Sequence, residues 1–208
     1  MITARAQVTI VIPTLSIRGA KLSRAVGSVL QQTHPVASVA VAVDHDHDGA
    51  WSTRNRAVAM AQTEWVGFLD DDDELLPFHV ESLLALAARE QADMVWGWFH
   101  VITVRGPTPE ADPFPMHRGR QYDPNDPHII PITYLVKREL LQAAVANMGG
   151  FKPDEIGAWD NQDMPVIQEM CRLGGKLAAT ATHTWLWHHW GYGTPGNPGN
   201  TSGLPGRW

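Results

Sequence analysis

The sequence predicts an α/β fold, with a mostly parallel central sheet and helices on both faces, in a single domain. Short runs of consecutive apolar residues alternate with longer segments in which apolar residues recur at helical spacing. The runs are apolar throughout rather than at every second position, which is typical of a parallel sheet covered on both sides. With 208 residues the chain fits one domain, and a domain of this size buries roughly 70% of its unfolded surface.

In the first half, strands and helices follow one another at α/β spacing. Strands are expected at 8–12, which Pro13 closes, and at 39–43, 64–69 and 94–104. Helices are expected between them, at 22–30, 51–62 and 80–86. If the strands are parallel, their carboxyl ends meet at one edge of the sheet, which is where open α/β sheets bind ligands.

The second half is less regular. Residues 105–128 are rich in Pro, Asp, Gly and Arg without a period, which predicts a mobile loop over the site. Helices are expected at 135–148 and 164–173, each followed by a glycine pair, and short strands at 177–182 and 185–188. These changes of pattern divide the single domain into residues 1–104, 105–128, 129–190 and a tail rich in Gly and Pro, 191–208.

Composition excludes several kinds of partner. The formal net charge is −6 and Lys and Arg are scattered, so nucleic acid and anionic membranes lack the basic patch that they need. A negatively charged ligand would therefore need a metal bridge. With Cys171 as the single cysteine there is no internal disulfide, and no apolar run approaches the length of a membrane span. We expect a cytoplasmic protein without an integral membrane segment.

Four consecutive aspartates, Asp70–Asp73, directly follow the apolar run 65–69; we call them the acidic run. Adjacent carboxylates repel by roughly 1 kcal/mol per pair in water and about 4 kcal/mol at a partly buried site. Folding holds such a cluster together most easily when a divalent cation sits in it. The alternative is a solvated turn in which an aspartate caps the following helix.

A second polar loop, Asp44–Gly49, follows the strand expected at 39–43. Its pattern D-x-D-x-D-G matches the opening of an EF-hand calcium loop, but position 12 is Asn55 rather than Glu, and a strand precedes it. Calcium is therefore rejected. A His-Asp phosphohydrolase is disfavoured because that site belongs to an all-helical setting. What remains is a polar loop at the same sheet edge as the acidic run.

In this order and spacing, the segments resemble the family 2 glycosyltransferases of the GT-A fold, which move a sugar from a nucleoside diphosphate sugar to an acceptor. The motifs that carry the resemblance are Val11–Thr14, Val43-Asp44, Arg54-Asn55 and 68–77. The resemblance implies a Rossmann-like half that binds the nucleotide sugar, residues 1–104, and an acceptor-side half, residues 129–190. Short members of this family occur in bacteriophages as well as bacteria.

The resemblance also implies roles for residues on the donor side. The nucleotide sugar would contact Pro13, Thr14, Asp44, Arg54, Asp70 and Asp71. Asp70 and Asp72 would form the D-x-D pair, with Asp72 as the direct metal ligand and Asp73 as an alternative. Structural interpretations stay open: Thr14 as a turn hydroxyl, Asp44 as a cap near a helix and Arg54 as a solvated cation.

On the acceptor side, Gly149-Gly150-Phe151 and the later pair Gln162-Asp163 resemble the family's G-G-F segment and E-D pair, with Gln162 in place of Glu. The resemblance implies that Asp163 is the catalytic base that takes the acceptor proton. Asp160 competes for this role, and Asp163 could instead be a helix N-cap.

Two neighbouring histidines lie where many family members place a metal-coordinating histidine. His189 is the favoured ligand and His188 the alternative. The Gly-Asn-x-Ser segment that often follows closely comes only at 199–202, so the alignment at this end is displaced. A structural histidine is the other interpretation.

The sequence thus predicts a hexosyltransferase-type enzyme that uses a nucleoside diphosphate sugar, a UDP-sugar by preference. Mn²⁺ or Mg²⁺ would assist a single displacement with inversion, and the acceptor would be a glycan or a protein. A sugar-phosphate nucleotidyltransferase is one alternative, but residues 13–19 do not supply its Gly-rich, basic phosphate loop. A nucleotide-sugar-binding module without turnover is another, because Gln162 replaces Glu.

Overall fold

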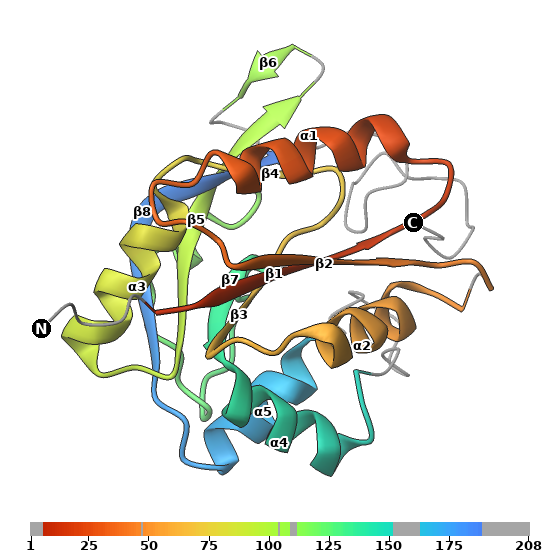
Figure 1. Ribbon diagram of the computed structural model, residues 1–208. Helices are drawn as coiled ribbons and strands as arrows, with labels where there is room; N and C mark the ends of the chain where they lie inside the picture. The colour runs from red at the N-terminus through yellow and green to blue at the C-terminus, as the bar shows by residue number, and fades with distance from the viewer. Residues whose placement is uncertain (1–5, 47, 104, 109–111, 152–162, 189–208) are drawn as a thin grey trace, which may run out of the picture.

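The computed structural model describes residues 6–46, 48–103, 105–108, 112–151 and 163–188 (Figure 1). Structural statements below concern these residues. The predictions for Asp160, Gln162, His189 and the tail lie outside the described residues.

The described strands form one mixed sheet. Its order is β2 (Ser38–Val43), β1 (Val8–Thr14), β3 (Trp65–Phe68), β7 (Tyr134–Lys137), β5 (Met94–Thr103), β8 (Leu177–His188) and β4 (Glu74–Leu75), with β6 (Gly106–Pro107) paired to β5. β1 is parallel to β2 and β3, and β5 is parallel to β8. β7 runs antiparallel between β3 and β5, and β4 and β6 are antiparallel to their neighbours. The mostly parallel sheet is therefore confirmed in part, because β4, β6 and β7 run against the direction that the other strands share.

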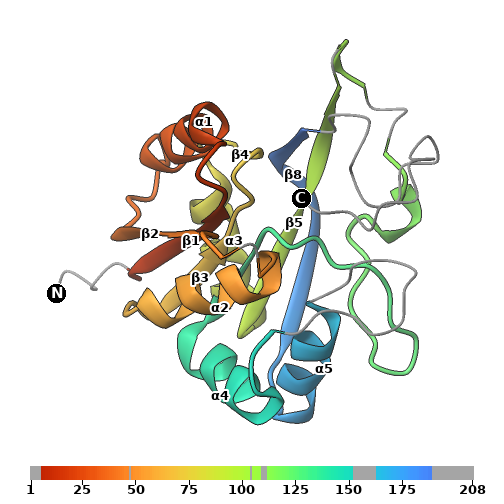
Figure 2. The same cartoon turned by 90° about the vertical axis from the view of Figure 1, so that its right-hand side faces the viewer.

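Helices cover both faces of this sheet (Figures 1 and 2). One face carries α1 (Gly19–Leu30) and α3 (His79–Glu90), and the other carries α2 (Ala50–Met60), α4 (Arg138–Met148) and α5 (Met164–Arg172). None of the helices within the described ranges is long and apolar enough to cross a membrane.

Because helices cover both faces of the sheet, the strands are apolar at consecutive positions. In β1, Ile10 and Ile12 pack in the core on the side of α1 and α3, whereas Val11 packs in the core on the side of α2, α4 and α5. All seven residues of β1 are buried. Full burial of one such aliphatic side chain contributes about 1.5–3 kcal/mol. A strand with two buried faces therefore has apolar residues at consecutive positions rather than at alternate ones.

Two predicted boundaries in the sequence are wrong, and one strand was not predicted. The helix expected at 135–148 begins only at Arg138, because 134–137 form β7. The strands expected at 177–182 and 185–188 are one strand, β8. Its pairing with β5 shifts register opposite residues 96–99 of β5. The short strand β4, which pairs with β8 ahead of α3, was not predicted. All three depend on pairing between distant strands, which a local pattern does not contain.

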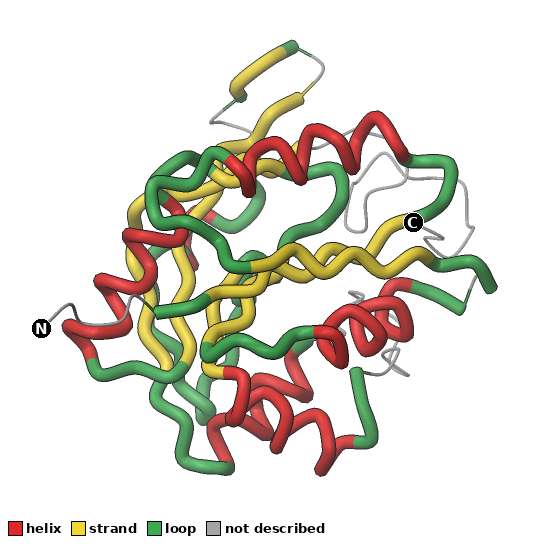
Figure 3. Tube along the Cα trace, in the orientation of Figure 1, coloured by secondary structure: helices red, strands yellow, loops and turns green. Residues whose placement is uncertain are grey.

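The described part of 105–128 contains more structure than a loop. It includes β6 and a 3-10 helix, η2 (Pro115–His117). The Gln121 side chain is bonded to both backbone groups of Ala179 in β8, at 3.0 Å each. Figure 3 shows this segment as loops and turns joined by these short elements. Its mobility and its place over a bound ligand stay predictions.

Candidate active site

The carboxyl ends of β1, β2 and β3 meet at one edge of the sheet (Figure 1). Thr14 ends β1, Asp44 follows β2, and the backbone N–H of Asp44 donates to the Thr14 carbonyl at 2.8 Å. Beside them, the N–H of Leu69 donates to the Val11 carbonyl at 3.1 Å, so the acidic run begins where β1 ends. Parallel pairing thus brings together residues that are up to 59 positions apart, at the edge that the sequence predicted.

Asp44 is buried, and backbone donors hold both of its carboxylate oxygens. Oδ1 accepts the N–H of Asp48 and Oδ2 accepts the N–H of Gly49, each at 3.1 Å. These bonds shape the turn that leads into α2, for which Gly49 is the N-cap residue with a φ of 100°. The structural interpretation of Asp44 therefore has direct support, and its contact with a nucleoside stays a prediction.

The four aspartates of the acidic run have different surroundings. Asp71 is buried and accepts hydrogen bonds from Thr14 Oγ1 and from Arg18 Nη1, both at 2.6 Å. Burial raises the pKa of Asp71, while Thr14 and Arg18 act in the opposite direction. The Asp71 carboxylate therefore connects the acidic run to the end of β1, because the Thr14 hydroxyl donates a hydrogen bond to it.

Asp73 is also buried, and it anchors the last described strand. Its Oδ1 accepts the backbone N–H of His188 at 2.9 Å, across 115 positions. Burial raises the pKa of Asp73 well above its ordinary value, and the charges of Asp70 and Asp72 add to that rise. The N-cap residue of α3 is Phe78, so the interpretation of the acidic run as a helix cap is wrong.

Asp70 and Asp72 are the two partly exposed members, with side chains 31% and 20% exposed. Asp72 pairs with Lys21 Nζ at 3.1 Å and with Arg18 at 3.4 Å. Asp70 Oδ1 accepts a hydrogen bond from Arg54 Nη2 at 2.9 Å. The acidic run is a turn, in which the backbone N–H of Asp73 donates to the Asp70 carbonyl at 3.2 Å.

Arg54 links the acidic run to the predicted base. Its side chain is only 9% exposed. Burial alone would lower the pKa of Arg54, but the nearby charges of Asp70 and Asp163 outweigh it and raise the pKa. The interpretation of Arg54 as a solvated cation is therefore wrong: it is a buried charge that pairs with Asp70 and interacts with the charge of Asp163.

Asp163 occupies the N-cap position of α5, but its side chain makes no capping hydrogen bond to the described helix backbone. The residue is 8% exposed. Its negative charge acts on Arg54 and on the buried hydroxyl of Tyr134, whose pKa is raised well above the ordinary value by burial first and by Asp163 second. The described structure therefore does not support Asp163 as a capping side chain, and its role as the base stays a prediction.

His188, the alternative metal ligand, lies at the end of β8 beside the acidic run. Its Nε2 is 2.6 Å from Glu74 Oε1. Burial lowers the pKa of His188, and the charge of Arg24 lowers it further. The ring is thus engaged by Glu74 in this structure, and the roles of His188 and His189 as metal ligands stay predictions.

The chain matches a known protein family over the segment that contains the acidic run. The model of the family described as Glycosyl transferase family 2 matches residues 45–144. This segment is similar to glycosyl transferase family 2. It contains α2 with Arg54, the whole acidic run and β7, and the resemblance predicted from the motifs is confirmed. No curated protein sequence matches the chain.

Solved structures share the fold. The crystal structure of S. aureus TarS 1-349 matches with a TM-score of 0.65 and 15% identity, covering 88% of this chain and 60% of that chain. Its complex with UDP matches with a TM-score of 0.64 and 15% identity, covering 88% of this chain and 60% of that chain. Its complex with UDP-GlcNAc matches with a TM-score of 0.65 and 14% identity, covering 88% of this chain and 58% of that chain. The chain therefore spans about three fifths of the length of these TarS structures. The likeness shows a GT-A-like fold.

The described residues can be compared with the ligand sets that divalent metals use. No three His, Cys, Asp or Glu side chains of the described residues form a group that could hold a metal ion. Mg²⁺ usually takes one or two carboxylates and completes its shell with substrate phosphates and water. Asp70 and Asp72 fit this pattern because both stay partly exposed. Binding of a divalent cation by Asp70 and Asp72 stays a prediction.

Sequence reasoning missed several residues around the family 2 segment. Asn55 holds the Gly149-Gly150-Phe151 segment: its Nδ2 donates to the Phe151 carbonyl at 2.9 Å and its Oδ1 accepts the Phe151 N–H at 2.8 Å. Gly150, with a φ of 102°, lies so close to Asn55 that a Cβ would come within 2.9 Å of Nδ2. The signal in the sequence that could have singled out Asn55 was its place next to Arg54 in the Arg54-Asn55 motif.

The basic residues of α1 were also missed. Arg18, Lys21 and Arg24 all pair with the acidic run or Glu74. The statement that Lys and Arg are scattered is wrong at this place, because the spacing 18, 21, 24 puts the three on one helix face.

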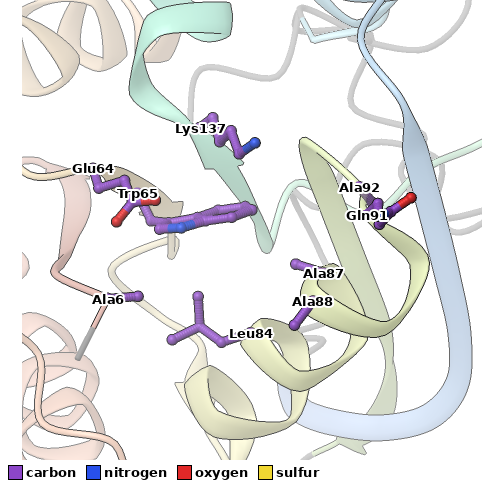
Figure 4. Close-up of a pocket in the computed structure, with 9 residues that line it drawn as sticks. All are labelled: Ala6, Glu64, Trp65, Leu84, Ala87, Ala88, Gln91, Ala92 and Lys137. Carbon is purple, nitrogen blue, oxygen red and sulfur yellow. The ribbon is translucent and has the colours of Figure 1, made fainter. Parts of the chain in front are cut away.

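A separate groove of about 340 Å³ lies at the opposite end of β3, among residues such as Trp65, Leu84 and Lys137 (Figure 4). Trp65 begins β3, whereas the acidic run follows its end. None of the predicted site residues lines this groove.

Proposed function

We propose that the chain is a glycosyltransferase that moves a sugar from a nucleoside diphosphate sugar to an acceptor hydroxyl. The observation that carries this proposal is the linked set of Asp70, Arg54 and Asp163 at the carboxyl edge of the sheet. One end of the set belongs to a partly exposed acidic turn suited to a metal diphosphate. The other end is a carboxylate at a helix start. A transferase that joins two substrates needs both within one site.

Asp163 is the proposed catalytic base. A carboxylate in this position takes the proton from the acceptor hydroxyl as that oxygen attacks the anomeric carbon. Arg54 supplies a positive charge that interacts with the negative charge of Asp163. The attack displaces the nucleoside diphosphate in one step, and inversion is inferred from the family resemblance.

Asp72, with Asp70 in support, would hold the divalent cation, and His188 or His189 would add a ligand. When bound, Mg²⁺ or Mn²⁺ offsets the negative charge that develops on the departing diphosphate. Hard oxygen ligands suit either ion, and a histidine ligand favours Mn²⁺. Asp71 and Asp73 maintain the turn on which the two exposed carboxylates lie.

A UDP-sugar is the donor we favour, because TarS, a structural neighbour, was crystallised with UDP and with UDP-GlcNAc. The acceptor is proposed to be a glycan or a protein, and the location to be cytoplasmic. The hexosyl group and the hydroxyl that receives it are to be found by screening.

A sugar-phosphate nucleotidyltransferase is the second candidate. One observation favours it: Arg18 and Lys21 supply basic side chains soon after β1, where such an enzyme needs them. The two reactions have different products. The transferase releases a nucleoside diphosphate, whereas the nucleotidyltransferase consumes a nucleoside triphosphate and a sugar phosphate and releases pyrophosphate.

The test is an assay of both reactions with Mn²⁺. We expect UDP release from one of a panel of UDP-sugars, increased by an acceptor mixture of glycans and peptides. Asp163→Asn is the matched control and should bind donor but release no UDP above background. Pyrophosphate release with nucleoside triphosphate and sugar phosphate, without UDP release, would replace the proposal by the second candidate. Donor binding with neither product would indicate a module without turnover.

A further inference from the structure

Three basic side chains extend from one face of α1 to the acidic run and the glutamate after it. Arg18 Nη1 lies 2.6 Å from Asp71, and Lys21 Nζ lies 3.1 Å from Asp72. Arg24 donates to the backbone carbonyl of Asp72 at 2.9 Å, and its Nε lies 3.1 Å from Glu74. The positive charges therefore lie where the sequence led us to expect a metal ion.

These cations change the electrostatics of the site. With Arg54, four positive charges face the four carboxylates of the acidic run and that of Glu74. Four positive charges against five negative ones leave a formal charge of about −1. The site is close to neutral without a metal ion. The premise that the acidic run repels an anionic ligand unless a cation is bound therefore no longer holds.

Arg18 and Lys21 are placed to change partners. Their side chains are 18% and 31% exposed, and ion pairs with such access to water contribute little stability. A diphosphate offers several strong acceptor oxygens. The Arg fork can bind phosphate with two hydrogen bonds, and Lys binds it as a point charge.

We propose that Arg18 and Lys21 bind the diphosphate of the donor, and that they exchange between the acidic run in the free protein and the phosphates in the complex. This inference rests on the proposed function and adds two phosphate-binding residues to its site. Arg24 stays on the backbone of Asp72 and on Glu74, and so holds the turn.

The exchange couples the basic residues to a divalent cation. A cation on Asp70 and Asp72 takes over the neutralisation of these carboxylates, and so releases Lys21 and Arg18 toward the phosphates. In the free protein the same side chains compete with the cation. Removal of Lys21 should therefore have opposite effects on two ligands, weakening diphosphate binding and strengthening metal binding. A residue with only a structural role would not change the two in opposite directions.

The experiment measures UDP and uridine binding by calorimetry in EDTA, with wild type, Lys21→Met and Arg18→Gln. We expect each variant to bind UDP about tenfold more weakly, the contribution of one charge-assisted hydrogen bond, with uridine binding unchanged. Mn²⁺ binding without nucleotide, followed by the free-ion resonance signal, should strengthen about twofold or more in Lys21→Met.

Arg89→Gln is the charge-matched control. Arg89 pairs with Glu90 at the exposed end of α3, and its side chain is 68% exposed. Arg18→Gln removes a partner of the buried Asp71 and so could also destabilise the fold. Lys21→Met removes a partner of the partly exposed Asp72, so it is the variant that decides the inference. An equal loss of UDP and uridine affinity, an unchanged ratio of the two in Lys21→Met, or weaker Mn²⁺ binding in that variant would overturn the inference.

Failure of this inference is distinguishable from failure of the proposed function. Sugar transfer by wild type, with the UDP to uridine ratio unaltered in Lys21→Met, overturns the inference alone. UDP binding that Lys21→Met weakens selectively, without transfer of any sugar, supports the inference and contradicts the proposed function. A wild-type protein that binds no UDP, GDP or dTDP, with or without Mn²⁺, overturns both.

Discussion

The substitution Asp163→Asn separates catalysis from structure at the start of α5. Asparagine keeps the volume and an oxygen at the N-cap position, but it cannot accept a proton at neutral pH. General base catalysis contributes about 10²–10⁴ in rate. We therefore expect sugar transfer to fall by about a hundredfold or more, while donor affinity stays within about twofold.

The expected cost in stability follows from the surroundings of Asp163. The side chain makes no capping bond to the described helix, so no cap is lost. Its charge acts on Arg54, which keeps its 2.9 Å bond to Asp70. Loss of one of two opposite charges should cost about 1 kcal/mol, which lowers Tm by roughly 2–4 °C in a domain of this size.

Single-turnover transfer of a radiolabelled sugar, with donor binding by calorimetry, measures both parts of this prediction. Asp160→Asn is the matched control, because Asp160 competes for the base role and lies three positions earlier. Transfer within a few-fold of wild type in Asp163→Asn would refute the reasoning. So would a large loss reproduced only by Asp160→Asn, which would leave Asp163 with a structural role.

Three further outcomes are expected. Asp72→Asn should abolish the joint rise in Tm that UDP and Mn²⁺ produce in thermal-shift assays. Because its ion pairs are partly exposed and worth about 0–1 kcal/mol, the ligand-free Tm should move by less than about 4 °C. A larger fall would give Asp72 a mainly structural role. Asn55→Ala should lower the free energy of unfolding in urea by about 2 kcal/mol, because it removes both hydrogen bonds to Phe151; an unchanged midpoint would contradict the clamp. Burial lowers the pKa of His79 from 6.5 to about 3, so the unfolded chain binds a proton between these values that the fold does not. Stability from this residue is therefore lost as the pH falls below 6.5, by about 2.7 kcal/mol at about pH 4.5. His79→Gln should lack this loss, and parallel pH dependences of the two proteins in urea titrations would refute the assignment.

Local patterns in the sequence determined much of the first half of the fold. β1, β2 and β3 and the helices after them were predicted because a strand covered on both faces is apolar throughout, and a helix covered on one face repeats its apolar positions every three or four residues. The edge that collects Thr14, Asp44 and the acidic run followed from the same alternation. The periods of these elements depend on neighbours in the chain, so the sequence contains them directly, and the shared edge follows once the strands are taken as parallel.

The tertiary structure alone decided which carboxylates of the acidic run are exposed to a ligand. Four identical aspartates in a row do not reveal that Asp71 and Asp73 are buried as anchors while Asp70 and Asp72 stay partly exposed. That difference comes from partners far away in the chain: Arg18 lies 53 positions before Asp71, and His188 lies 115 positions after Asp73.

The antiparallel insertion of β7 and the short β4 were likewise decided by distant pairing. β7 lies between β3 and β5, and β4 pairs with β8, which follows it by more than a hundred residues. A four-residue and a two-residue strand are too short to display a period. Periodicity reports only which faces of an element are buried, whereas the partner of a strand or of a charge is set by the packing of the whole chain.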